Sequence, residues 1–379
     1  MQVLIGTSKG LMVYEILPDT VPKELAIHFL GFSVNMIFVD ERSHRWWVGI
    51  AHRHWGQKVH YSDDQGASWE EAKLPSYQGF KMINGAPAKL KEIWSMQHGG
   101  ADSQRLWLGT EPGGLFSSIN GGATFELNEP LWNHTSRQKE GKWFGAGSDF
   151  PFIHSIEINP HNSSHLYVAI SCAGIFESMD NGASWQPRNK GLLATYLPNP
   201  NVEVGQDPHQ LLINPEAPNV LWQQNHCGIY FTKNGGKLWT EVFLKKGISS
   251  YGFSLAIDEK NPARSWVIPV ESDQRRVAPD LKLEVFETTN FGQSWKSVSK
   301  GLPITHSFDI VLRKSFKRKE NLMIFGTTNG NLFYTLEETP YWQLISSHLT
   351  KVNTVCICLL YTSDAADDLL CVDLGGRRI

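Results

Sequence analysis

The amino-acid sequence predicts an all-β protein, a seven-bladed β-propeller. Three observations lead to this fold. A short glycine-containing box recurs along the chain, four strand-like segments accompany each box, and the two chain ends together supply one further set of four. The 14 tryptophans and 33 glycines among 379 residues are typical of an aromatic-rich fold with many turns.

The box recurs five times at nearly constant intervals. Each copy has a hydroxyl residue, any residue, Asp or Asn, any residue, Gly, two further residues and an aromatic, as in "SDDQGASW". Repetition at a fixed period indicates a repeat architecture. The closing aromatics, separated by 54 to 60 residues, are Trp69, Phe125, Trp185, Trp239 and Trp295, and a degenerate sixth copy ends in Trp342.

The third position of the box decides its role. It is Asp64 and Asp180 in two copies but Asn120, Asn234 and Asn290 in the other three. An amide keeps the hydrogen-bond acceptor and loses the charge, so it cannot replace a general acid, a general base or a hard-metal ligand. We therefore interpret the boxes as turns in which this side chain caps backbone N–H groups and the aromatic packs beneath.

The remaining segments supply the blades. Strands of alternating or apolar pattern, such as "HLYVAI" and "HQLLINP", give four short strands per unit. The N-terminal residues supply three strands, and Lys351 to Ile357 supply the fourth, so both ends close a seventh blade and remove the open sheet edges. The six complete units are expected at residues 33–75, 92–130, 152–190, 208–245, 251–300 and 306–346.

The last residues follow a different pattern. From about residue 358 the text "CLLYTSDAADDLLCVDLGGRRI" departs from the repeats and is similar to translated read-through of sequencing adapters. We therefore expect one propeller domain at residues 1–357 and a non-native tail at residues 358–379.

Composition and charge limit the classes of partner. The formal net charge is −3 and no apolar run is long enough to span a bilayer, which argues against nucleic acid and membrane partners. The basic run "RKSFKRKE" (residues 313–320) is interpreted as a solvated outer turn. Five cysteines without framework spacing and a start that lacks secretion-signal features predict a cytoplasmic protein. We expect a monomer without a cofactor.

The boxes resemble the Asp-box, or BNR, repeats of the sialidase-like superfamily. The segments "GTSKGL", "GTEPGGLF", "PNPNVEVGQDPHQL" and "QQNHCGIY" are similar to bacterial single-domain BNR proteins labelled sialidase-like or glycosyl hydrolase. The resemblance covers residues 1 to about 357 and implies the propeller fold and a glycan-related activity. Sialidases have six blades and an arginine triad that is not recognisable in this sequence, so the resemblance does not extend to conventional exo-sialidase activity.

Loops from all blades are expected to meet at one mouth on the channel axis. Glu111 and Glu203 are the candidate catalytic pair, because glycoside hydrolysis uses two carboxyl groups. Candidate ligand-binding residues are His154, His209, Asn225, His226 and Glu271.

Three of these histidines allow other interpretations. His154, His209 and His226 could together hold a metal ion, but their spacing matches no compact metal motif and no metal site is assigned. Each histidine could instead satisfy a backbone carbonyl inside the channel. The sequence thus favours a propeller that binds a polar ligand, such as a glycan, at its mouth and can hydrolyse a glycoside there. The alternative is a non-catalytic scaffold that binds a protein partner.

Overall fold

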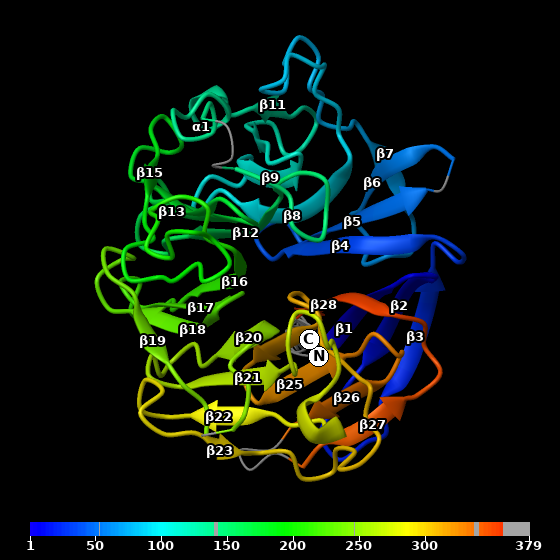
Figure 1. Cartoon of the computed structure of the whole chain (residues 1–379). Helices are drawn as coiled ribbons and strands as arrows, with labels where there is room; N and C mark the ends of the chain where they lie inside the picture. The colour runs from blue at the N-terminus through cyan, green and yellow to red at the C-terminus, as the bar shows by residue number, and fades with distance from the viewer. Residues whose placement is uncertain (53, 140–142, 246, 337–340, 359–379) are drawn as a thin grey trace, which may run out of the picture.

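The computed structural model describes residues 1–52, 54–139, 143–245, 247–336 and 341–358. They form the predicted seven-bladed β-propeller, in which every blade is a four-stranded antiparallel sheet (Figure 1). Among these residues no helix has the length and apolar composition needed to cross a membrane.

The blades follow the chain order. The first three complete blades consist of β4 (Ser33–Asp40), β5 (Arg45–His52), β6 (Gly56–Ser62) and β7 (Glu70–Ala72); β8 (Glu92–His98), β9 (Leu106–Glu111), β10 (Leu115–Ser118) and β11 (Glu126–Leu127); and β12 (Ile153–Ile158), β13 (Leu166–Ile170), β14 (Gly174–Ser178) and β15 (Gln186–Pro187).

The next three blades repeat this arrangement. They consist of β16 (Pro208–Ile213), β17 (Leu221–Asn225), β18 (Gly228–Thr232) and β19 (Thr240–Val242); β20 (Gly252–Ile257), β21 (Ser265–Pro269), β22 (Phe286–Thr288) and β23 (Lys296–Ser297); and β24 (Phe316–Lys319), β25 (Leu322–Gly326), β26 (Leu332–Thr335) and β27 (Gln343–Ser346). A short helix α1 (Glu129–Trp132) and a 3-10 turn η1 (Pro279–Leu281) lie in loops.

The seventh blade contains both ends of the propeller. It joins β28 (Val352–Cys358), as its inner strand, to β1 (Gln2–Thr7), β2 (Gly10–Glu15) and β3 (Lys23–His28). β1 and β28 pair antiparallel, with Val3 opposite Ile357 and Ile5 opposite Val355. This confirms the predicted closure of the ring by the two chain ends.

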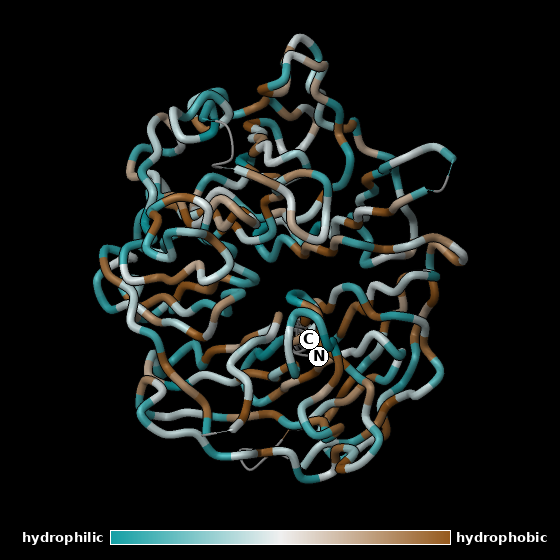
Figure 2. The backbone as a smooth tube through the Cα atoms, viewed as in Figure 1, coloured by the Kyte–Doolittle hydropathy of each residue, from teal (hydrophilic) through white to brown (hydrophobic). Residues whose placement is uncertain are grey.

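Apolar side chains fill the space within and between the blades. Figure 2 shows hydrophobic stretches along the strands and hydrophilic stretches at many of the turns. Burial of large aromatic rings, beside the more numerous aliphatic side chains, removes much apolar area from water. Side chains less than 2% exposed include Trp46, Trp47, Trp107, Trp222, Trp266 and Trp342.

All five boxes form the same turn between the third and fourth strands of a blade. In the copy after β14, Ser178 Oγ donates to Asp180 Oδ1 (2.8 Å) and accepts from the Gly182 N–H (2.7 Å). The Ser184 N–H donates to Asp180 Oδ1 (2.8 Å). The same three hydrogen bonds recur in the boxes that contain Asp64, Asn120, Asn234 and Asn290.

The box glycine also brings neighbouring blades together. Gly182 has a positive φ of 84°, and a Cβ there would lie 2.9 Å from the ring of Trp107 in the preceding blade. Only glycine combines this backbone conformation with so close an approach. The box is therefore a turn and an inter-blade contact, and its acidic position acts through hydrogen bonds to the backbone.

Ser178→Ala is expected to lower the free energy of unfolding by about 1–3 kcal/mol, because it leaves the buried Gly182 N–H without its acceptor. Asp180→Asn is expected to cost much less, because three other boxes carry Asn at the same place. Urea denaturation of both variants measures the difference. Equal losses would show that the carboxylate charge, and not the hydrogen-bonded turn, stabilises the box.

Candidate functional site

A cavity of about 650 Å³ opens where the inner strands of the propeller begin. Every blade contributes to its wall, so the cavity lies on the axis of the ring. Its lining residues near the starts of the seven inner strands are Ser33 and Asn35, Glu92 and Trp94, Phe152, Asp207 and His209, Tyr251 and Phe253, Arg313 and Lys314, and Lys351 and Asn353.

A β-bulge near the start of the inner strand directs side chains into this channel. In six of the seven blades, the pairing between the inner strand and its neighbour skips one residue of the inner strand. A bulge places one extra residue on a strand and re-aims its side chain. The skipped residues are Asn35, Trp94, His154, His209, Phe253 and Asn353, and five of them line the mouth cavity.

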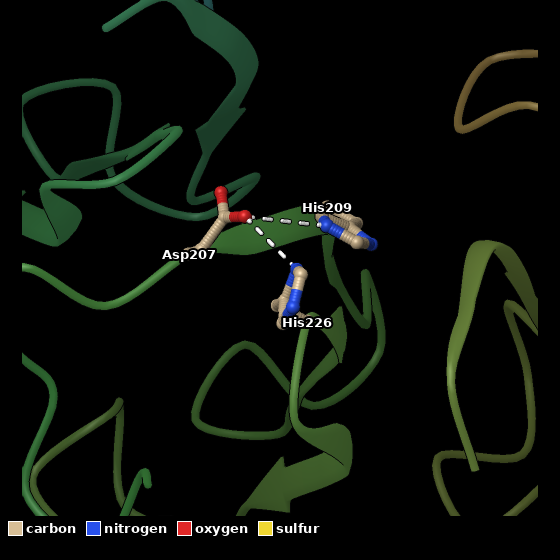
Figure 3. A group of neighbouring side chains, drawn as sticks. All are labelled: Asp207, His209 and His226. Atoms are coloured by element: carbon tan, nitrogen blue, oxygen red, sulfur yellow. Dashed lines mark ion pairs between the residues drawn. The ribbon is translucent and has the colours of Figure 1, made fainter. Parts of the chain in front are cut away.

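One carboxylate and two imidazoles converge on the wall formed by the blade of β16 to β19 (Figure 3). Asp207 Oδ2 lies 3.4 Å from His209 Nε2 and 3.4 Å from His226 Nδ1. Asp207 and His209 are 4% and 2% exposed, whereas about a quarter of the His226 side chain is open to solvent. His226 lies in the turn between β17 and β18, and its N–H donates to the Asp207 carbonyl (2.9 Å).

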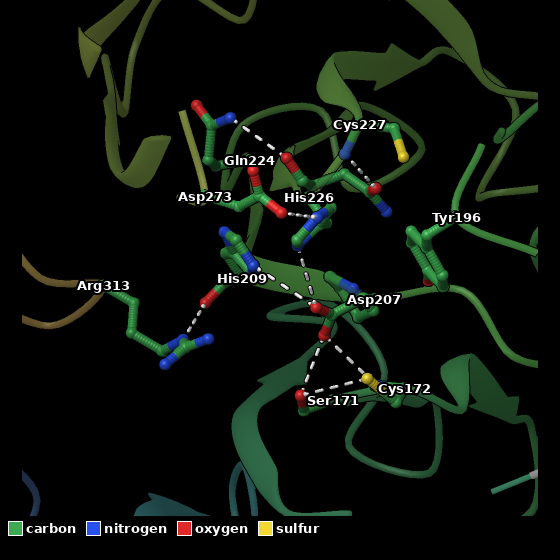
Figure 4. A network of polar contacts seen from close by, with 12 residues as sticks. Ser171, Cys172, Tyr196, Asp207, His209, Gln224, His226, Cys227, Asp273 and Arg313 are labelled. Atoms are coloured by element: carbon green, nitrogen blue, oxygen red, sulfur yellow. Dashed lines mark hydrogen bonds and ion pairs between the residues drawn. The ribbon is translucent and has the colours of Figure 1, made fainter. Parts of the chain in front are cut away.

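Surrounding groups hold this cluster in place (Figure 4). Asp207 Oδ1 accepts hydrogen bonds from Ser171 Oγ (2.8 Å) and the Cys172 N–H (3.1 Å). Burial alone would raise the pKa of Asp207, but the contacts with His209 and His226 hold it well below its usual range. Burial lowers the pKa of His209, against the opposing effect of Asp207.

Arg313 crosses the channel beside this cluster. Its Nε donates to the His209 carbonyl (3.0 Å), and its guanidinium lies 5.2–5.9 Å from the ring centroids of Trp94, Phe152 and Phe253. Trp94 and Phe152 stack with centroids 4.0 Å apart. An arginine held among aromatic faces gains cation–π attraction, which partly offsets its loss of hydration.

Glu92 and Lys314 form a second polar group in the wall. Burial raises the pKa of Glu92, whose carboxylate accepts a hydrogen bond from Asn35 Nδ2 (3.0 Å). Burial lowers the pKa of Lys314 to about 7, an effect that Glu92 opposes. Within the described part of the chain, Lys314 Nζ and Trp94 Nε1 are buried and have no hydrogen-bond partner.

The two candidate catalytic acids lie outside the cavity wall. Glu111 is buried at the end of β9, where it accepts a hydrogen bond from Ser148 Oγ (2.6 Å) and pairs with Lys91 Nζ (3.2 Å). Glu203 is exposed and accepts from the Asn189 N–H (3.2 Å). The structure does not bring these two side chains together in the mouth.

The candidate ligand-binding residues divide into two groups. His209 and His226 meet at the cavity, with ring centroids 5.5 Å apart. His154 is enclosed below them, because its Nε2 donates to the Pro208 carbonyl (2.7 Å) and its Nδ1 contacts Ser155 Oγ (2.9 Å). Asn225 is buried and accepts from the Cys227 N–H (3.0 Å), and Glu271 pairs with Arg275 (3.4 Å).

The interpretation of residues 313–320 as a solvated outer turn is wrong. Phe316–Lys319 form the inner strand β24, and Arg313 and Lys314 reach into the channel. Because this strand is rich in lysine and arginine, its sequence does not show the apolar pattern expected of an inner strand. Glu92 was also missed, although an alignment of "EIWSM" with "FIHSI" and "DPHQL" places the start of β8 at the same point as the two histidine-bearing strands.

Sequence comparison finds one distant relative of known activity. No family model matches the chain. An oligoxyloglucan reducing end-specific xyloglucanase of Emericella nidulans is 23% identical over 274 residues, which cover 63% of this chain and 30% of that protein. The chain therefore spans less than a third of the length of this curated relative.

Structure comparison shows the fold. An ancestral GH74 enzyme aligns with a TM-score of 0.55 and 17% identity, over 82% of this chain and 38% of the other. YCF48 bound to D1 peptide aligns with a TM-score of 0.54 and 12% identity, over 88% and 89%. Sqt1 of Saccharomyces cerevisiae aligns with a TM-score of 0.52 and 12% identity, over 93% and 84%. The chain thus shares the propeller architecture with a glycoside hydrolase and with a propeller that binds a peptide.

Lys314 is expected to make stability depend on pH. Between pH 7 and 10.5 the unfolded chain holds a proton that folded Lys314 has lost, so the free energy of unfolding rises with pH in that window. From pH 7 to 9 the gain is about 2 kcal/mol. Urea denaturation at both values should show this gain in the wild type, relative to Lys314→Met.

The exposed residue Lys89 supplies the control for this measurement. Lys89→Met removes a lysine that lies outside the cavity wall and should keep the wild-type pH dependence. If Lys314→Met retains the same rise between pH 7 and 9, then Lys314 is charged in the folded protein across this range.

Proposed function

We propose that this chain is a sialidase-like, Asp-box propeller that binds a glycan in its central mouth. The observation that carries the proposal is the pair of buried donors, Lys314 Nζ and Trp94 Nε1, which have no partner among the described residues and belong to the cavity wall. A buried polar group without a hydrogen bond costs about 1–3 kcal/mol. Both atoms are closed to solvent, so ligand oxygens remove this cost once the two side chains turn toward the cavity.

The rest of the wall supports a polyhydroxylated ligand. Sugars combine hydroxyl groups, which donate and accept hydrogen bonds, with apolar faces that pack on aromatic rings. The cavity offers the stacked rings of Trp94 and Phe152, the carboxylates of Glu92 and Asp273, and the cations Arg276 and Lys351. Its volume of about 650 Å³ is within the range of small-molecule sites. The distant relation to a xyloglucanase supports the choice of a glycan.

A protein-binding scaffold is the less favoured function. Such a surface is expected to carry an apolar patch or charges of one sign. The mouth instead combines acids and bases around a cavity. We place the protein in the cytoplasm, because its five cysteines lack the spacing of a disulfide framework. We further propose that it is a monomer.

Isothermal titration calorimetry with xyloglucan-derived and acidic oligosaccharides tests glycan binding. Lys314→Met and Trp94→Phe each remove one unpaired donor and keep much of the side-chain shape. Each is expected to raise the Kd by about 5- to 150-fold, which corresponds to about 1–3 kcal/mol. Lys89→Met is the matched control and should bind as the wild type does. A wild-type protein that binds none of these sugars, or variants that bind equally well, would contradict the proposal.

Hydrolysis is the second candidate function, and the raised pKa of Glu92 favours it. A general acid must still hold its proton near neutral pH. In this mechanism Glu92 donates its proton to the glycosidic oxygen as the C–O bond breaks. Water adds to the anomeric carbon and loses a proton to Asp273, whose exposed carboxylate borders the same cavity. Proton exchange with solvent then returns a proton to Glu92 and removes one from Asp273.

Glu92→Gln is expected to reduce the release of reducing ends from xyloglucan oligosaccharides by at least 100-fold while oligosaccharide binding persists. Glu203→Gln, which alters an acid that the sequence singled out, is the comparison. If Glu203→Gln shows the loss and Glu92→Gln does not, then the assignment of Glu92 is wrong. If the wild type binds sugars without cleaving them, the function is binding alone.

A further inference from the structure

We propose that Asp207, His209 and His226 bind one divalent transition-metal ion, such as Zn²⁺, at the cavity wall. The ligand atoms are Asp207 Oδ2, His209 Nε2 and His226 Nδ1, and the three side chains offer atoms within 4.8 Å of one another. Two imidazoles and one carboxylate are a donor set that zinc and related ions accept. This inference is independent of the proposed glycan function.

The spacing of these atoms fits a shared ion better than shared protons. A charge-assisted N–H···O bond is about 2.7–2.9 Å long, whereas both histidine nitrogens lie 3.4 Å from the same carboxylate oxygen. Two ligands that are each about 2.1 Å from a tetrahedral ion are separated by about 3.4 Å. The two separations from Asp207 Oδ2 therefore match those between ligands of one ion.

The outer contacts orient each ligand for this role. His209 Nδ1 donates to the Gly252 carbonyl (2.6 Å), so its Nε2 is the nitrogen that points at the cluster. Asp207 uses Oδ1 for Ser171 and the Cys172 N–H, which leaves Oδ2 for the ion. Metal-binding histidines and carboxylates have such supporting hydrogen bonds.

The backbone holds the three ligands before any ion arrives. Asp207 and His209 flank Pro208 at the start of β16, where Pro208 pairs with Asn225, the residue before His226. The His226 N–H donates to the Asp207 carbonyl (2.9 Å). The ligands thus come from two adjacent strands of one blade, which lowers the entropy lost on binding.

Charge and access complete the site. Asp273 Oδ2 lies 3.8 Å from His226 Nε2, so Asp207 and Asp273 together supply two negative charges near a dication. His226 and His209 both face the cavity, which provides an entry path and an open coordination position. A zinc ion with three protein ligands and an open position has the coordination typical of catalytic sites.

His154 belongs to the set that the sequence suggested for a metal, but it does not fit this site. Both of its ring nitrogens contact protein atoms, Ser155 Oγ and the Pro208 carbonyl. Asp207 takes the third position instead. A variant of His154 would therefore not test the metal site. The test requires variants of the proposed ligands themselves.

Metal binding is measured with the purified full chain and the metal alone. Zn²⁺ titration by calorimetry should give one ion per chain, and Co²⁺ should give visible d–d absorption bands typical of four or five ligands. His226→Ala and Asp207→Asn are each expected to weaken Zn²⁺ binding by at least 100-fold and to remove the Co²⁺ bands. Circular dichroism checks that both variants remain folded.

Two control variants exclude binding elsewhere. His161→Ala alters an exposed histidine, and Cys227→Ser alters the thiol next to His226. Both are expected to bind Zn²⁺ as the wild type does. The proposal is overturned if the wild type binds no ion and gives no Co²⁺ bands. Asp207, His209 and His226 would then form a hydrogen-bonded ion pair without a metal. The proposal is also overturned if His226→Ala binds Zn²⁺ as tightly as the wild type, or if Cys227→Ser abolishes binding.

Discussion

Ring closure is the constraint on which the remaining structure depends. β1 and β28 are separated by almost the whole described chain, yet they pair along six consecutive residues of β1. Without this pairing the first and last blades would expose open sheet edges, and the channel would have no fixed diameter. Closure sets how far apart the seven inner strands lie. The positions of the groups in the mouth therefore depend on the pairing of β1 with β28.

The bulges of the inner strands place the side chains that line the candidate site. Each bulge costs regular pairing at one residue and turns one side chain into the channel. The same backbone device presents Asn35, Trp94, His209, Phe253 and Asn353 to the mouth cavity. These side chains differ in chemistry, whereas the boxes at the opposite ends of the strands keep the same hydrogen bonds. In the five blades that carry both features, the box that stabilises the turn and the bulge that points toward the channel lie at opposite ends of the blade.

This separation explains what the sequence could predict. The box turns, the strands and the closed ring follow from local hydrogen bonding and apolar pattern, so the seven blades were predictable. His209 and His226 were also found, because "DPHQL" and "NHCG" lie at predicted strand starts and turns. Glu111 and Glu203 were chosen from loops, whose course depends on long-range packing. Lys314 was assigned to the surface, because lysine does not fit the apolar pattern of a buried strand. Exceptions to this pattern are expected at functional sites.

The mouth holds ionisable groups that a stability-optimised channel would not contain. Arg313 is surrounded by aromatic rings, Lys314 Nζ is enclosed without a partner in the described residues, and Asp207 Oδ2 lies 3.4 Å from each of two imidazole nitrogens. The burial of Arg313 and Lys314 costs free energy in the protein alone. The buried tryptophans and the five boxes supply stability elsewhere in the ring and can offset this cost. Lys314 and the cluster of Asp207, His209 and His226 line one cavity, so a ligand and an ion bound there would lie side by side.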